Sequence, residues 1–296
     1  MGHVTGCHEN DRQRMNSVNI AALNRKRKVI RYSSIAVAAV DLAAILMIMT
    51  GWQLPGAVIG LAALIGGAVF KRKGKKAFEE ECCRLQTLRA LGVADGAYMP
   101  EEKKTADWLR NTHLVPSSSQ LTEPVLWHGI KGQLRGAAVE IAEMTMGCQE
   151  SNKKQATYSS GVYVRTKMDK PVENPVLLLG KFAFKHAALR AEYEKDGLRL
   201  SPVGGKEKGW YALTEGAVSP DAALLEKFDE VCSVAKHRVV MYLAGDELVA
   251  FFSGQFYTGE FPLEEDVTEG MFKKHSFAAI VPLMAMAAGE GETVLS

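Results

Sequence analysis

Few residues in this chain have the types and the spacing that catalysis requires. His113 and His128 lie on either side of three serines at 117–119, but nearness in sequence does not build a catalytic triad, and a solvated loop explains these residues better. Glu140 and Glu143 are three residues apart in a predicted strand, so their carboxylates point to opposite faces of the sheet. The sequence has no nucleophile elbow, no phosphate-binding loop and no histidine pair with zinc-ligand spacing. We therefore predict no catalytic residues, no cofactor and no metal ion.

Asp41 is the residue with the least ordinary surroundings. It lies near the middle of an apolar run, where a charge costs roughly 2.5–3.5 kcal/mol on membrane-insertion scales. No lysine or arginine occurs in the apolar runs to neutralise it. We expect its carboxyl to be protonated, or hydrogen-bonded to a copy of itself or to another subunit. A tolerated, neutral aspartate without a function is the simpler alternative.

Two apolar runs, residues 32–52 and 54–70, are the elements around which the chain is organised. A transmembrane helix needs about 20 apolar residues, and the second run is near the short end of the accepted range. The turn between the runs is uncharged, and Pro55 is well placed to begin a second helix. The three aromatic residues at the ends of the runs fit the membrane interfaces: Tyr32, Trp52 and Phe70. The pattern predicts a transmembrane helical hairpin.

Basic residues flank both outer ends of this hairpin, and small residues line its two helices. The basic residues are Arg25, Lys26, Arg27, Lys28 and Arg31 before the hairpin, and Lys71, Arg72, Lys73, Lys75 and Lys76 after it. The positive-inside bias predicts that both termini are cytoplasmic and that these cations contact anionic lipid of the inner leaflet. The predicted helix–helix packing residues are Gly56, Gly60, Ala63 and Gly67 on the second helix, with Ala36, Ala39 and Ala43 on the first.

Charge differs sharply between the two parts of the chain. Residues 1–76 hold 12 basic and 3 acidic residues, whereas the remaining 220 hold 24 basic and 31 acidic. The second part has no basic stripe with interleaved aromatic residues, so we expect no nucleic-acid partner. The five cysteines contain no C-x-x-C pair and are expected to be reduced. Acylation of Cys82 and Cys83 is a less favoured alternative to two ordinary helix cysteines.

The predicted fold class is α+β: an N-terminal two-helix transmembrane hairpin plus a cytoplasmic domain with an antiparallel β-sheet and packed helices. The predicted divisions are a mobile segment at 1–24, with a helix beginning near Met15, the hairpin with its basic flanks at 25–76, a juxtamembrane helix and linker at 77–97, and the cytoplasmic domain at 98–296.

Within the last region, residues 161–168 alternate so that Tyr163, Arg165 and Lys167 share one face of a half-buried strand. The predicted helices are a short one at 101–110, one begun by Ser219-Pro220-Asp221 and one within 277–288. The predicted strands form a hairpin of 124–130 with 134–144, single strands at 175–184 and 208–213, and a hairpin of 238–243 with 248–252 around Gly245-Asp246. Residues 92–100 are predicted as a linker and residues 187–193 as a polar segment.

The order of these features resembles a domain-of-unknown-function family (number 3137) of bacterial double-spanning membrane proteins. The resemblance extends over roughly residues 25–288. It rests on the basic-flanked hairpin, on Gly161-Val162-Tyr163-Val164, on the strand–turn–helix at 210–225 and on the phenylalanine-rich return at 238–261. It implies a membrane hairpin with a cytoplasmic α+β domain, and it supplies no catalytic residues.

We expect a membrane-anchored cytoplasmic interaction or regulatory protein in the bacterial cytoplasmic membrane, with a protein partner or self-association. One alternative is an oligomeric proton- or ion-responsive membrane element that uses Asp41. Another is an enzyme whose unrecognised site uses His128, Glu140 or His186.

Overall fold

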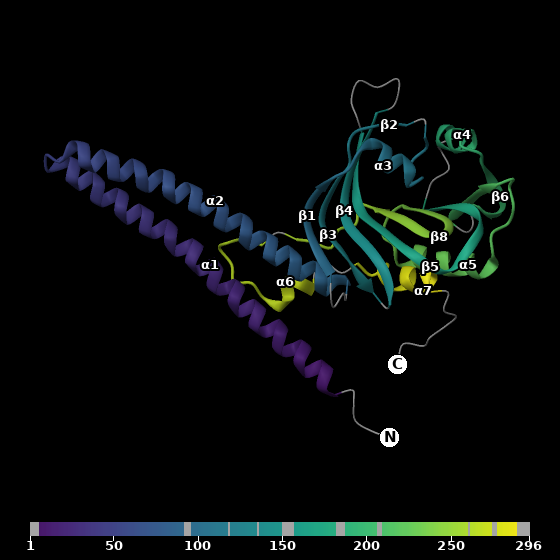
Figure 1. Ribbon diagram of the computed structural model, residues 1–296, viewed down its shortest axis with the longest axis horizontal. Coiled ribbons are helices and arrows are strands. Elements are labelled where there is room, and N and C mark those ends of the chain that lie inside the picture. The colour runs from purple at the N-terminus through teal and green to yellow at the C-terminus, as the bar shows by residue number, and fades with distance from the viewer. Residues whose placement is uncertain are drawn as a thin grey trace. The chain divides into compact units, whose positions relative to one another are not determined.

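The computed structural model describes residues 6–91, 96–117, 119–134, 136–149, 157–181, 187–205, 209–259, 261–273 and 277–288. The fold is α+β, as the sequence predicts: two long apolar N-terminal helices precede an antiparallel sheet with a few helices (Figure 1). The chain divides into two units. The helical unit is Met1–Leu85 with Gly259–Lys274, and the sheet unit is Gln86–Thr258 with His275–Ser296.

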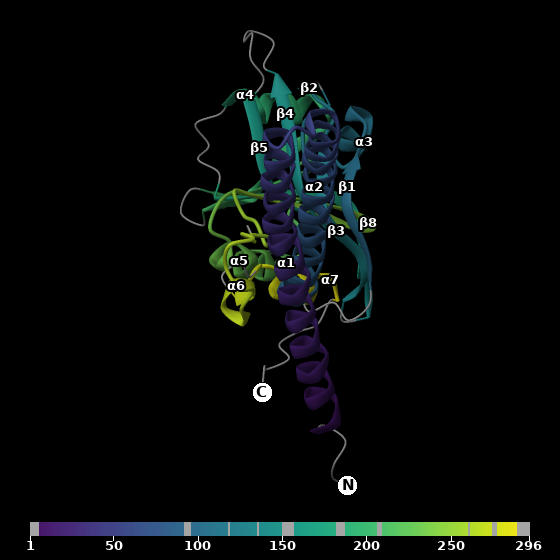
Figure 2. The ribbon, with the colours of Figure 1, turned by 90° about the vertical axis from the view of Figure 1, so that its left-hand side faces the viewer.

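The helical unit is a long antiparallel hairpin. Its helices α1 (Gly6–Met49) and α2 (Gln53–Leu91) lie side by side (Figure 2), and α2 continues into the sheet unit. Gly51, with a φ of 96°, allows the tight turn between them. The described helix begins at Gly6, earlier than the predicted start near Met15. At about 1.5 Å per residue, each helix is much longer than the ~30 Å of hydrocarbon that a bilayer offers.

The remaining elements belong to the sheet unit, except α6 (Glu269–Lys273), which belongs to the helical unit. In the described residues of the sheet unit the strands are β1 (Gly96–Lys103), β2 (Gln120–Leu121), β3 (Val125–Leu134), β4 (Ala137–Gln149), β5 (Thr157–Gly180), β6 (Leu198–Gly205), β7 (Trp210–Glu215) and β8 (Val239–Ser253). The helices are α3 (Ala106–Asn111), α4 (Ala187–Lys195), α5 (Ala222–Val234) and α7 (Ile280–Ala287).

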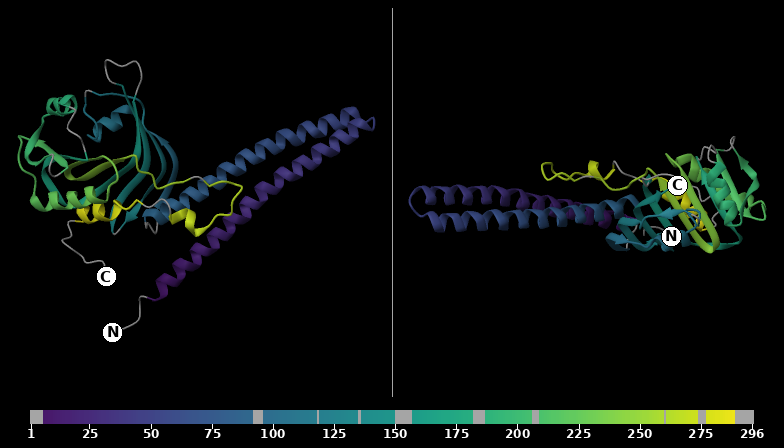
Figure 3. Two further views of the ribbon diagram at one scale, coloured as in Figure 1. Left: turned by 180° about the vertical axis from the view of Figure 1, so that it is seen from behind. Right: turned by 90° about the horizontal axis from the view of Figure 1, so that it is seen from above.

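The sheet is built around the 24-residue strand β5. The order β1-β3-β4-β5-β7-β6 arises because β4 pairs with the first half of β5 and β7 with its second half. Strand β8 pairs along the opposite edge of β5, from Gly161↔Ser253 to Gly180↔Val239. The curved sheet, with α5 and α7 on one side of it, is visible from behind in Figure 3.

Both faces of the sheet are buried over much of their area. On one face, α5 and α7 cover the strands, and Phe228 and Leu283 are fully buried there. On the other face, α3 and α4 contribute Leu109 and Tyr193 to a smaller cluster around Tyr163. The beginning of β5 therefore has the alternating burial that the sequence predicts, with Val162 and Val164 in the first cluster and Tyr163 in the second.

The predicted hairpin at Gly245-Asp246 is wrong, because residues 239–253 form one continuous strand. Gly245 has a φ of 54°, and the register between β5 and β8 shifts between Lys167 and Val172 and again before Val176. Since β5 offers one long edge, β8 bends at Gly245 and resumes pairing instead of turning back. The strands predicted at 161–168 and 175–184 are, over their described residues, parts of this same β5.

Other predicted boundaries also differ from the structure. The turn between β3 and β4 lies after Leu134, which pairs with Ala137, and not at 131–133. Residues 96–100 of the predicted linker lie in strand β1, and the predicted polar segment at 187–193 lies in helix α4. Of the helix predicted at 101–110, only its second half is α3, which continues to Asn111 and is capped by the Thr105 side chain. The α5 cap is Asp221 rather than Ser219, since the Asp221 carboxylate accepts the Ala223 N–H at 3.1 Å. The predicted last helix is α7.

Candidate functional site

Exposed apolar side chains concentrate on the helical hairpin. Eighteen of the 24 exposed large hydrophobic side chains described lie between Val29 and Phe70. Only 6% of the most apolar window of each helix is buried. A water-soluble surface rarely carries a continuous apolar band of this extent. The two helices are long and apolar enough to span a membrane.

Glycines of α2 let the two helices approach closely. A Cβ atom built on Gly56 would lie 2.8 Å from the Ala44 carbonyl oxygen, and one on Gly67 would lie 2.5 Å from Val37. Gly60 is in similar contact with Ala44, at 3.3 Å. Three residues of the predicted stripe, Gly56, Gly60 and Gly67, therefore lie against α1, and Ala63 is half-buried.

The partner face of α1 is not the predicted one. Ala36, Ala39 and Ala43 are exposed, whereas Val37 and Ala44 face α2. The reason is steric. Gly56, Gly60 and Gly67 leave space on α2 that larger residues of α1 occupy, so two stripes of small residues need not face each other.

Asp41 lies on this same interface. It is half-buried on the helix face that carries Val37 and Ala44, and these two residues contact α2 on either side of it. Its Oδ1 atom is buried and has no hydrogen-bond partner among the described residues. The structure therefore places an unsatisfied carboxyl oxygen inside the hairpin of a single chain.

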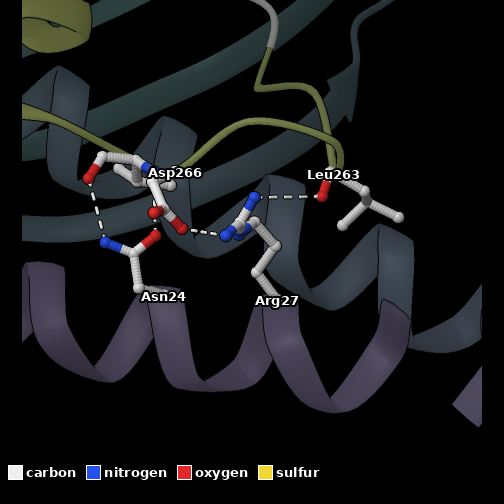
Figure 4. A network of polar contacts seen from close by, with 5 residues as sticks. Asn24, Arg27, Leu263 and Asp266 are labelled. Carbon is white, nitrogen blue, oxygen red and sulfur yellow. Dashed lines mark hydrogen bonds and ion pairs between the residues drawn. The ribbon is translucent and has the colours of Figure 1, made fainter. Parts of the chain in front are cut away.

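A polar network fastens the segment before α6 to α1 (Figure 4). The Asn24 amide donates to the Val267 carbonyl at 3.0 Å and accepts the Val267 N–H at 2.8 Å. The Arg27 guanidinium donates to the Leu263 carbonyl at 3.3 Å and pairs with Asp266. Arg27 is only 5% exposed, so its predicted contact with lipid is wrong.

The other nine predicted flanking cations are exposed. Three of them have carboxylate partners: Lys26 pairs with Glu81, Lys75 with Glu79 at 3.5 Å and Lys76 with Glu80 at 3.9 Å. Exposed ion pairs of this kind are weak, so these side chains stay available to a charged surface.

Replacing Arg27 by alanine should release the segment around Leu263, because the side chain that holds its carbonyl and Asp266 is lost. We expect faster cleavage after Glu264 and Glu265 by a glutamate-specific protease. Lys28→Ala removes the same charge from an exposed neighbour and should leave the cleavage rate unchanged. Equal cleavage rates for the two variants would contradict this role of Arg27.

In the sheet unit, His128 lies at an irregular point of β3 where the register shifts between Trp127 and Ile130. Its φ of 49° is unusual for a residue with a Cβ. The ring Nδ1 lies 2.9 Å from the Tyr98 hydroxyl, and the His128 carbonyl accepts the Tyr257 hydroxyl at 2.8 Å. His128 is therefore a structural junction between strands and the loop after β8.

Glu143 holds the same loop. One carboxylate oxygen accepts the N–H groups of Tyr257 and Thr258 at 2.9 and 2.8 Å, and the other accepts the Thr258 hydroxyl at 2.6 Å. Glu140, by contrast, lies 3.2 Å from Lys131. His128 and Glu140 have different partners, and His186 lies outside the described residues. The structure thus gives His128 and Glu140 separate roles and does not join them in one site.

The described cysteines are structural in their surroundings. Cys82, Cys83 and Cys232 are buried. Burial, with a smaller contribution from Asp229, raises the pKa of the Cys232 thiol to about 12. Acylation of Cys82 and Cys83 would need exposed thiols, and the buried positions argue against it.

Comparison with protein-family models, curated proteins and solved structures finds no match to this chain. The family resemblance therefore stays a prediction from the residues. In the described residues, no three histidine, cysteine or acidic side chains are grouped as a metal site would require.

The region that the sequence reasoning missed lies on the α3 side of the sheet. Trp108 packs against Tyr163 with ring centres 5.2 Å apart, and His113 stacks on Tyr242 at 4.4 Å. Arg165 donates through Nε to Glu247, and that bond raises the pKa of the guanidinium. The strand alternation at 161–168 was the available signal, since it had placed Tyr163 and Arg165 on one face.

The Tyr163 hydroxyl is the unusual atom of this region. It is buried and has no hydrogen-bond partner among the described residues, a condition that costs about 1–3 kcal/mol for a polar group. Burial, and to a smaller degree Glu140, raises the pKa of Tyr163, so the hydroxyl keeps its proton at physiological pH.

Proposed function

We propose that this chain is an integral protein of the bacterial cytoplasmic membrane, and that its sheet unit acts on the cytoplasmic side as an interaction or regulatory module. The observation that carries the proposal is the continuous exposed apolar band on α1 and α2. Basic residues border the band at the open end of the hairpin, and the turn at the closed end is uncharged. This charge asymmetry favours cytoplasmic termini and contact with anionic lipid.

Membrane extraction and topology test the proposal. Washing membranes at high pH with carbonate should leave the chain in the pellet, and detergent should solubilise it. A reporter that is active only in the cytoplasm should work when fused after Ser296. A chain that carbonate releases, or a reporter active only when exported, would contradict the proposal.

A second candidate function is an oligomeric proton- or ion-responsive element. It is favoured by one observation, the buried and unsatisfied Oδ1 of Asp41 within the apolar interface. Proton or cation flux in proteoliposomes that is lost in Asp41→Asn would support it. Flux that is absent, or that Asp41→Asn leaves unchanged, would rule it out.

A further inference from the structure

We propose that the α3 side of the sheet holds a binding site for a small dipolar ligand with the chemistry of a free aromatic amino acid: a carboxylate, an ammonium group and a flat apolar side chain. This inference concerns the sheet unit alone and does not depend on membrane insertion.

The site begins as a cavity of about 260 Å³ where α3 ends over the sheet. Its aromatic lining is Trp108, His113 and Tyr242. His113 has a φ of 55°, an uncommon conformation for a residue with a Cβ, and its ring stacks on Tyr242 with an interplanar angle of 27°. Non-glycine residues in this conformation are often found at binding sites. The flat walls and the volume suit one aromatic ring.

Arg165 provides the polar recognition group. Glu247 engages its Nε atom and so orients the guanidinium, whose two terminal nitrogens take no part in this ion pair. These nitrogens form a planar fork that matches a carboxylate. Arg165 and Glu247 line both the aromatic cavity and a neighbouring, more open trough of about 580 Å³.

The charges of the trough indicate a ligand that is neutral overall. Three cations and three carboxylates line it: Lys131, Arg165, Lys167, Glu140, Asp246 and Glu247. Balanced lining charges favour neither an isolated anion nor an isolated cation. A carboxylate bound at Arg165 adds one negative charge, and an adjacent ammonium group restores the balance beside a lining carboxylate.

Tyr163 supports the aromatic wall of the cavity from behind. Tyr163 is fully buried. It precedes Arg165 by two positions on β5, so both side chains lie on the same face of the sheet. Its hydroxyl has no hydrogen-bond partner among the described residues and does not line the cavity, whereas the Trp108 ring packed on Tyr163 belongs to the cavity wall. Tyr163 therefore helps to hold Trp108 in place, and a ligand in the cavity contacts the Trp108 ring rather than the Tyr163 hydroxyl.

Isothermal titration calorimetry on the full-length chain in detergent tests the proposal with three probes. L-Phenylalanine carries both charges, phenylacetate lacks the ammonium group and phenethylamine lacks the carboxylate. We expect saturable binding of L-phenylalanine, and at least about tenfold weaker binding of each analogue, as the loss of a charge-assisted hydrogen bond implies. No saturable binding of L-phenylalanine, or equal binding of all three probes, would overturn the proposal.

Two variants locate the binding. Arg165→Gln should weaken L-phenylalanine binding at least about tenfold, whereas Arg199→Gln removes the same charge from an exposed position of β6 and should have no effect. His113→Gly relieves the unfavourable φ, so the fold should survive, and the lost ring should weaken binding several-fold. Unchanged affinity in both Arg165→Gln and His113→Gly would place any binding elsewhere and reject this site.

Discussion

Gly56→Leu is expected to force α1 and α2 apart at the closed end of the hairpin. A Cβ at this position would lie 2.8 Å from the Ala44 carbonyl oxygen and 2.8 Å from the Ile48 side chain. The oxygen is a backbone atom, so it cannot rotate away as a flexible side chain can. Overpacking typically costs about 1–3 kcal/mol, and we expect the upper end of that range or more. The measurement is the thermal unfolding midpoint in detergent, followed by circular dichroism at the helical band.

Gly66→Leu is the matched control for this experiment. It makes the same chemical change on the same helix, but a Cβ there meets nothing within 4 Å. The leucine should point away from α1 and leave the midpoint within experimental error. Because leucine favours a helix more than glycine does, equal losses in the two variants would mean that added bulk anywhere on α2, and not close packing at Gly56, determines the result.

Glu143→Ala should destabilise the sheet unit by about 3–5 kcal/mol. The carboxylate is buried and accepts three hydrogen bonds from Tyr257 and Thr258, two of them from backbone N–H groups. Alanine leaves these donors without an acceptor, and each unsatisfied buried group costs roughly 1–3 kcal/mol. The loss should be measured as a change in the free energy of unfolding in urea, with tryptophan fluorescence as the signal.

Glu143→Gln tests whether the hydrogen-bond acceptor or the negative charge of this side chain stabilises the sheet unit. The amide oxygen can still accept both backbone N–H groups, so we expect a loss of only about 1–2 kcal/mol. The Thr258 hydroxyl can in turn accept from the amide nitrogen. Similar losses for glutamine and alanine would show that the negative charge, rather than the satisfied loop backbone, matters at this position.

Local patterns were sufficient to predict several elements. The apolar runs, the last helix and the alternation at 161–168 depend on neighbouring residues, and the structure has each of them. The Gly245-Asp246 pair shows the limit of such patterns. The pair fits a tight turn, but whether the chain turns or only bends depends on the strand it pairs with, and the long edge of β5 decides in favour of a bend.

In the candidate sites, too, some residues could be placed from the sequence and others only from the tertiary structure. Tyr163 and Arg165 could be placed on one face from alternation alone. The aromatic residues Trp108, His113 and Tyr242 come to that face from α3, from the turn after it and from β8, far away in the chain. Arg27 could not be distinguished from Lys28 by sequence, because its partner Asp266 lies 239 residues away.

The sequence by itself determined the two apolar helices, their basic flanks and the α+β class, because hydropathy and periodicity are properties of adjacent residues. Only the tertiary structure decided which face of α1 packs on α2, which cation is withdrawn into a polar network and which aromatic rings surround Arg165. Those outcomes depend on side-chain shape and on contacts between distant segments, which no local pattern contains.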